Sequence, residues 1–157
     1  MAYKLRDIGL VCAISLALLA PVRAAMEPDN VAAQVRDAAK MCREMGGTPN
    51  TDAMLTVDDL NGDGGEDWIV DYKKLQCAGT PNPFCGSGGC ALQIFLWSSG
   101  SNWTKVFDDT VQTYHFAKAR GHRVLEVKFG GSACGKTNYQ NCPKTYRFER
   151  GGLFPAK

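Results

Sequence analysis

Ala91-Leu92-Gln93-Ile94-Phe95-Leu96-Trp97 is the stretch of this 157-residue chain that decides the fold. In an extended strand, successive side chains point to opposite faces, so Leu92, Ile94 and Leu96 share one face. Phe95 and Trp97 lie on the other face with Gln93. Both faces are largely apolar, and this pattern predicts a central strand of a sheet.

Further strand-like runs flank this stretch on both sides, and short turns rich in glycine, serine, asparagine or aspartate separate several of them. They cover residues 53–57, 67–73, 103–107, 111–117, 123–129 and 145–149. Successive strands joined by short turns predict an antiparallel meander.

Residues 28–45 predict one helix ahead of the strands. Asp29 or Asn30 can cap its start, and Gly46-Gly47 can end it. Apolar residues recur at spacings of three and four, which marks one helix face; they are Val31, Val35, Ala38, Cys42 and Met45. One helix packed on an antiparallel sheet predicts an α+β fold, with residues 25–157 forming a single domain.

Residues 1–24 have the pattern of a secretory signal peptide. Lys4 and Arg6 precede the apolar run 8–20, and Val22-Arg23-Ala24 offers small residues for cleavage. The run is shorter than the roughly 20 residues that span a bilayer, although a short membrane anchor or a buried helix remains an alternative. We therefore expect a mature protein that begins near Ala25, is periplasmic or secreted, and does not insert stably into a membrane.

Charge gives the mature chain no long-range attraction to polyanions. Without Lys4, Arg6 and Arg23 the 18 basic residues fall to 15, and without Asp7 the 16 acidic residues also fall to 15. The mature chain is formally neutral, so binding to nucleic acid or to an anionic membrane surface is not expected.

Six cysteines remain after residues 1–24 are removed. They are Cys42, Cys77, Cys85, Cys90, Cys134 and Cys142. An even number in an exported chain predicts disulfides, and the short polar loop between the last two favours their pairing. The other four would form two more bridges in an order that sequence does not determine. A zinc site formed by Cys77, Cys85 and Cys90 is the alternative, but no nearby histidine completes it.

The acidic segment 59–67 is the most specific motif of the chain. Oxygen-bearing side chains stand at loop positions one, three, five and nine, and glycine stands at position six. This spacing is typical of loops that bind calcium, which accepts about 6–8 oxygen ligands. The candidate ligands are Asp59, Asn61, Asp63, Asp67 and the carbonyl of Gly65. The alternative is an acidic turn without metal. We expect calcium with a structural role.

This loop is not an EF-hand, because Val70 occupies position twelve, where an EF-hand needs glutamate. It leads into the apolar strand run 68–70 instead of a helix. In this respect it resembles the calcium loops of FG-GAP and VCBS-type repeats, which lie between strands of β-propellers. The motif occurs once, and one copy cannot form a propeller. The resemblance therefore implies metal ligation only.

Residues 130–137 match the spacing of a P-loop, but the context argues against nucleotide binding. A P-loop needs a helix whose N-terminus holds phosphate, and Pro143 prevents a long helix here. We expect a disulfide-closed loop instead. The two histidines, His115 and His122, are expected to be surface or packing residues, and Gly86-Ser87-Gly88-Gly89 lacks the spacing of a hydrolase nucleophile turn.

The order of the motifs resembles a group of small exported proteobacterial proteins of uncharacterised function. The resemblance depends on the signal peptide, the helix, the single calcium-type loop and two cysteine–glycine motifs, 84–90 and 131–135. It implies a periplasmic or secreted location and no particular activity.

Together these features predict an exported, non-catalytic binding domain. We expect disulfides and bound calcium to stabilise it. Its expected partner is a protein or another component of the cell envelope. Binding of nucleotide or nucleic acid is not expected. The alternative is an extracytoplasmic metal-dependent hydrolase that uses the acidic loop.

Overall fold

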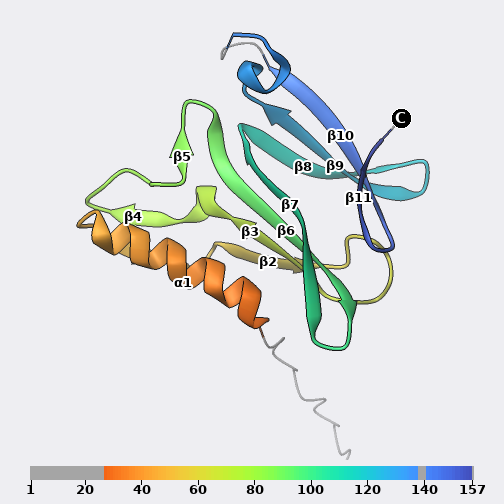
Figure 1. Ribbon diagram of the computed structural model, residues 1–157, viewed down its shortest axis with the longest axis horizontal. Helices are drawn as coiled ribbons and strands as arrows, with labels where there is room; N and C mark the ends of the chain where they lie inside the picture. Colours follow the sequence, from red (N-terminus) through yellow and green to blue (C-terminus); the bar gives the residue numbers. More distant parts are fainter. Residues whose placement is uncertain (1–26, 138–140, 157) are drawn as a thin grey trace, which may run out of the picture.

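The computed structural model describes residues 27–137 and 141–156, so the predicted signal peptide lies outside the described residues. Helix α1 (Asp29–Glu44) covers one face of a five-stranded antiparallel sheet, and a four-stranded antiparallel sheet packs on the other face (Figure 1). The prediction of an α+β fold with one N-terminal helix on antiparallel strands is confirmed.

Strand β6 (Gly89–Ser99) is the centre of the five-stranded sheet. It pairs on one edge with β3 (Asp67–Asp71) and the short β5 (Cys85–Gly86), and on the other with β7 (Asn102–Val111). Strand β2 (Leu55–Asp58) pairs with β3. The predicted central strand is therefore confirmed, and it extends beyond the stretch 91–97 at both ends.

The four-stranded sheet has the order β11-β10-β9-β8. Its strands are β8 (Thr113–Ala119), β9 (His122–Phe129), β10 (Cys142–Glu149) and β11 (Gly152–Pro155). A small third sheet pairs β1 (Thr48–Asn50) with β4 (Gln76–Ala78). The strands therefore do not form one continuous meander but belong to separate sheets. The chain leaves the first large sheet after Val111, and the next residue, Gln112, already bonds to the second: its N–H donates to the Lys128 carbonyl of β9, 2.8 Å away.

The core is divided between the two faces of β6. Leu92, Ile94 and Leu96 pack between the sheets with residues of β9 such as Leu125 and Val127. Phe95 packs on the opposite face, against the helix and β3. The alternation within β6 therefore fills two cores at once.

The buried stripe of the helix is narrower than predicted. Val31, Ala38 and Cys42 are fully buried, whereas Val35 is half-buried. Met45 follows the last helical residue and its side chain is 44% exposed. The predicted helix itself is confirmed with ends one residue inside the expected range.

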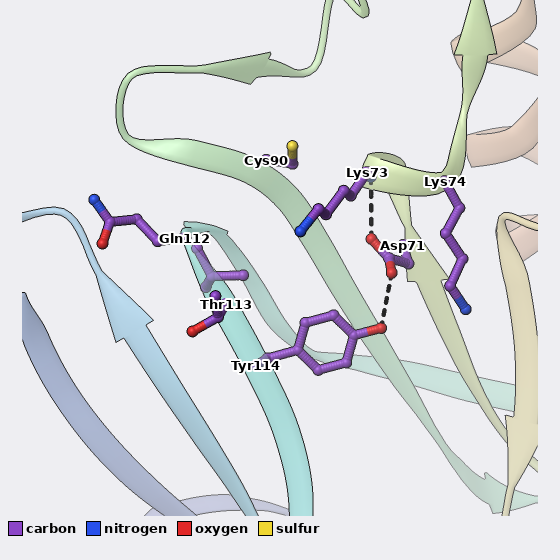
Figure 2. Close-up of a pocket in the computed structure, with 8 residues that line it drawn as sticks. Asp71, Lys73, Lys74, Cys90, Gln112, Thr113 and Tyr114 are labelled. Atoms are coloured by element: carbon purple, nitrogen blue, oxygen red, sulfur yellow. Dashed lines mark hydrogen bonds between the residues drawn. The ribbon is translucent and has the colours of Figure 1, made fainter.

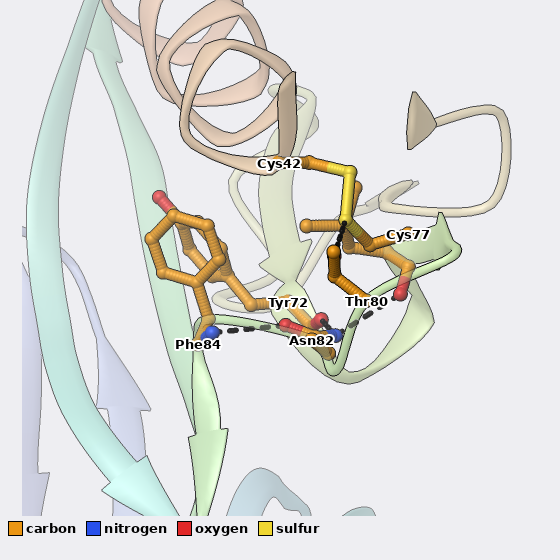
Figure 3. The surroundings of a disulfide bond; sticks show 7 residues. Cys42, Tyr72, Cys77, Thr80, Asn82 and Phe84 are labelled. Atoms are coloured by element: carbon orange, nitrogen blue, oxygen red, sulfur yellow. Dashed lines mark hydrogen bonds between the residues drawn. A yellow bond between two sulfur atoms is a disulfide. The ribbon is translucent and has the colours of Figure 1, made fainter. Parts of the chain in front are cut away.

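The disulfide Cys42–Cys77 joins the last turn of α1 to β4, with a Cα–Cα distance of 5.8 Å (Figure 3). Gly47 lies so close to this bridge that a β-carbon there would be 2.5 Å from the Cys77 sulfur. The disulfide therefore fixes the end of the helix to the small sheet formed by β1 and β4.

The other two bridges are local. Cys85–Cys90 joins directly opposed residues of β5 and β6, and Cys134–Cys142 closes the loop before β10. The second of these is the pairing that the short polar loop favours. With all six cysteines in disulfides, the zinc alternative for Cys77, Cys85 and Cys90 does not describe this structure. In the described part of the chain, no helix is long and apolar enough to cross a membrane.

Candidate functional site

The acidic loop connects β2 to β3 and closes on its own backbone. The Asp59 carboxylate accepts the N–H groups of Gly62 and Gly64 at 2.8 and 3.1 Å. Asn61 and Asp63 accept the N–H groups two residues ahead of them, at 2.9 and 2.8 Å. Gly64, at position six, has φ +82°, so the sharp left-handed turn lies where the spacing predicts it.

Asp67 differs from the other acidic residues of the loop because it is fully buried. Its carboxylate accepts the Leu60 N–H and the Trp97 N–H, both at 2.8 Å. Burial raises the pKa of Asp67 to about 6, and these two amide hydrogen bonds oppose that rise. In this structure Asp67 bridges the loop to β6.

The donor set of the loop suits a hard cation, because every predicted ligand is an oxygen. Within residues 27–137 and 141–156, no three acidic, histidine or cysteine side chains lie close enough to hold one ion. Asp59, Asn61 and Asp63 share the loop surface, Gly65 is half-buried beside Trp97, and Asp67 is directed to backbone amides. Calcium binding stays a prediction.

The remaining sequence candidates lie apart from one another. Residues 131–134 form a short 3-10 helix, and Gly135, with φ +68°, follows its last residue. The loop closed by Cys134–Cys142 begins at the end of this helix. His115 is exposed on β8 and pairs with Glu126 at 2.9 Å, and His122 is exposed at the start of β9.

A cleft of about 530 Å³ lies where the chain passes from one large sheet to the other (Figure 2). We call it the inter-sheet cleft; its lining consists of Asp71, Lys73, Lys74, Cys90, Val111, Gln112, Thr113 and Tyr114. These residues come from the end of β3 and the short helix η1 (Tyr72–Lys74), the start of β6, and the junction of β7 with β8. A volume of this size is typical of small-molecule sites, which span about 300–1,000 Å³.

The floor of the inter-sheet cleft is a hydrogen-bonded pair that connects the two sheets. The Tyr114 hydroxyl donates to the Asp71 carboxylate at 2.9 Å, and the other oxygen of this carboxylate accepts the Lys73 backbone N–H at 3.0 Å. Burial raises the pKa of Tyr114, and the charge of Asp71 raises it further. A phenol is protonated at neutral pH in any case, and the raised pKa means that Tyr114 still donates to Asp71 at alkaline pH.

One wall of the cleft is the hairpin closed by Cys85–Cys90. Gly89 has φ +117°, and a β-carbon there would lie 2.1 Å from the Val111 carbonyl oxygen. Only glycine permits this approach between the hairpin and the end of β7. Gly89, one of the glycines of the motif 84–90, thus has a structural explanation: it lets the hairpin pack against the strand.

Comparisons with protein-family models, with curated proteins and with solved structures find no match to this chain. The argument for a function therefore depends on the chain's own residues.

Sequence reasoning did not identify the inter-sheet cleft, because its residues come from three separate segments. A partial signal was present. Asp71, Lys73 and Lys74 follow the apolar run 68–70 directly, and a polar cluster at the end of a buried strand is a recurrent feature of binding sites.

Proposed function

We propose that the protein is an exported, non-catalytic binding domain that uses the inter-sheet cleft to hold a protein or another component of the cell envelope. Its three disulfides support an oxidising, extracytoplasmic environment, since such bonds persist outside the reducing cytosol. The observation that carries the proposal is a cleft with a part-buried, hydrogen-bonded floor and a disulfide in its wall.

The chemistry of the described residues supports binding more than catalysis. The six cysteines are oxidised, so none offers a thiolate nucleophile. Both histidines are exposed and lie outside the cleft. Tyr114 and Asp71 use their hydrogen-bonding groups on each other, which positions them without leaving a free general base.

Capture from an envelope extract tests this proposal when a cleft variant is compared with a surface variant. Lys73→Glu reverses a charge in the cleft, and Lys118→Glu makes the same change at an exposed position of β8 outside it. We expect the mature protein and Lys118→Glu to retain the same component, and Lys73→Glu to lose it. Equal retention by all three proteins would contradict the assignment of the cleft.

The hydrolase alternative has its own test. Profiling of ester, peptide and glycan substrates, with and without chelator, is expected to show no turnover. Turnover that chelator and Asp63→Ala both abolish would replace the binding proposal with metal-dependent hydrolysis, because Asp63 is a candidate ligand of the acidic loop.

A further inference from the structure

Lys73 is a cation of the inter-sheet cleft that no acidic side chain neutralises. It takes part in none of the ion pairs formed by the described residues. Asp71, the acidic residue of the lining, already accepts the Tyr114 hydroxyl and the Lys73 backbone N–H. Figure 2 shows the Lys73 side chain extending into the space between Cys90 and Tyr114. A cation placed there favours an anionic ligand.

The other cation of the lining is placed differently. Lys74 extends on the far side of Asp71 (Figure 2), and its ammonium contacts the Thr56 hydroxyl at 3.5 Å. The charge directed into the cleft is therefore that of Lys73 alone. A single ammonium matches a monoanion better than a phosphate, which favours several donors.

The walls that face Lys73 are mostly apolar. Tyr114 is half-buried and offers its ring, and Cys90 is half-buried and bonded to Cys85; Val111, which is 4% exposed, adds little further surface. Gln112 and Thr113 add an amide and a hydroxyl at the rim. An apolar body would bury surface on these walls, while a charged end reached the ammonium.

We propose that the inter-sheet cleft binds a small organic monocarboxylate whose carboxylate ion-pairs with Lys73 and whose apolar body packs on the Tyr114 ring and the Cys90 side of the disulfide. The inference rests on the proposed binding function and deepens it by naming the ligand class. A carboxylate suits this site because one ammonium neutralises its single negative charge.

Matched probes test charge and apolar body separately. Hexanoate, hexanamide and hexylamine share one chain length, and benzoate, benzamide and benzylamine repeat the series with an aromatic body; inorganic phosphate supplies charge without a body. Amide chemical shifts of the isotope-labelled mature protein report binding at the junction of β7 with β8 and at η1. Because Lys73 is exposed, we expect saturable shifts there with the acids, and affinities up to about fivefold weaker with the amides, the amines and phosphate.

Two variants make the result specific. Lys73→Gln keeps most of the side-chain volume and removes the charge, so it should weaken binding of the acids by up to about fivefold and bring their affinity close to that of the amides. Lys118→Gln, the same change on β8 outside the cleft, should leave their affinity unchanged.

The outcomes separate the two proposals. Equal binding of acids, amides and amines at the cleft, or binding of the acids that Lys73→Gln does not weaken, would overturn the monocarboxylate assignment and leave the cleft as a binding site. No shift at the cleft with any probe would overturn the monocarboxylate assignment, whereas equal capture of the envelope component by Lys73→Glu and Lys118→Glu would overturn the proposed function itself.

Discussion

Replacing Cys42 and Cys77 together by alanine should destabilise the protein more than replacing Cys85 and Cys90 together. The first bridge joins residues 35 positions apart, and the second joins residues 5 apart. In the chain-entropy model, the unfolded chain gains more freedom when the longer loop is opened. For loops of these sizes the model gives losses of about 3.8 and about 2.1 kcal/mol, a difference of about 1.7 kcal/mol.

Burial acts in the same direction as loop length. Cys42 is fully buried and Cys77 is 9% exposed, so removing their sulfur atoms leaves space in a packed region. Cys85 and Cys90 are half-buried, so their replacement leaves a smaller defect. The difference between the two double variants should therefore be at least that of the entropy model.

Urea unfolding of the mature protein, followed by circular dichroism without reductant, measures both losses, and the slope with denaturant checks that the two transitions stay comparable. Equal losses, or a larger loss for Cys85 and Cys90, would refute the argument from loop length and burial. Amide hydrogen exchange gives a second measurement. Because α1 buries only three side chains fully, we expect its amides to exchange faster once the Cys42–Cys77 bridge is absent.

Three further predictions concern other parts of the fold. Gly89→Ala should lower the free energy of unfolding by about 3 kcal/mol or more, because it combines a strained backbone with a clash against Val111. Gly86→Ala, in open space on the same hairpin, should lower it by under about 1 kcal/mol. Calcium added to chelator-treated protein should raise the midpoint of thermal unfolding, and at a hundredfold excess over Kd the gain in unfolding free energy should be about 2.7 kcal/mol. Asp63→Ala should remove this rise, and no rise in the parent protein would contradict the predicted site. Burial raises the pKa of Tyr72 from 10.0 to about 12, so the folded protein keeps a proton that the unfolded chain loses between these pH values. Tyr72 should therefore lower stability by up to about 3 kcal/mol as pH rises from about 10 to about 12. In urea unfolding at alkaline pH, Tyr72→Phe should make the slope shallower without abolishing it, because the pKa values of Tyr114 and Tyr146 are also raised.

The elements that sequence predicts well are those with a local periodic signal. The helix 28–45 and the strand 91–97 are found where predicted, because spacing alone distinguishes a helix face from the two faces of a strand. The short strands β1, β4, β5 and β11 have two to four residues each, too few for a period to be visible. Their existence depends on the partner strand instead.

Division of the strands into two large sheets lies beyond a local signal. The chain changes sheets at Gln112, where no glycine or proline marks a break. The change depends on which partner is nearer after Val111, and that partner is β9, which occurs later in the chain. The inter-sheet cleft exists because of this change, so its key contact joins Asp71 to Tyr114 across 43 positions.

Asp67 shows that a residue at a motif position can have a structural role of its own. Spacing makes it the ninth position of a calcium-type loop, but its carboxylate accepts an amide from Trp97, 30 positions away, and another from Leu60. A buried carboxylate that satisfies two buried amides already has a structural reason to be acidic. The case for calcium therefore depends on Asp59, Asn61 and Asp63, which are more exposed and bond within the loop. For this reason a variant at Asp63 tests the metal, whereas a variant at Asp67 would disturb the contact between the loop and β6 whether or not calcium binds.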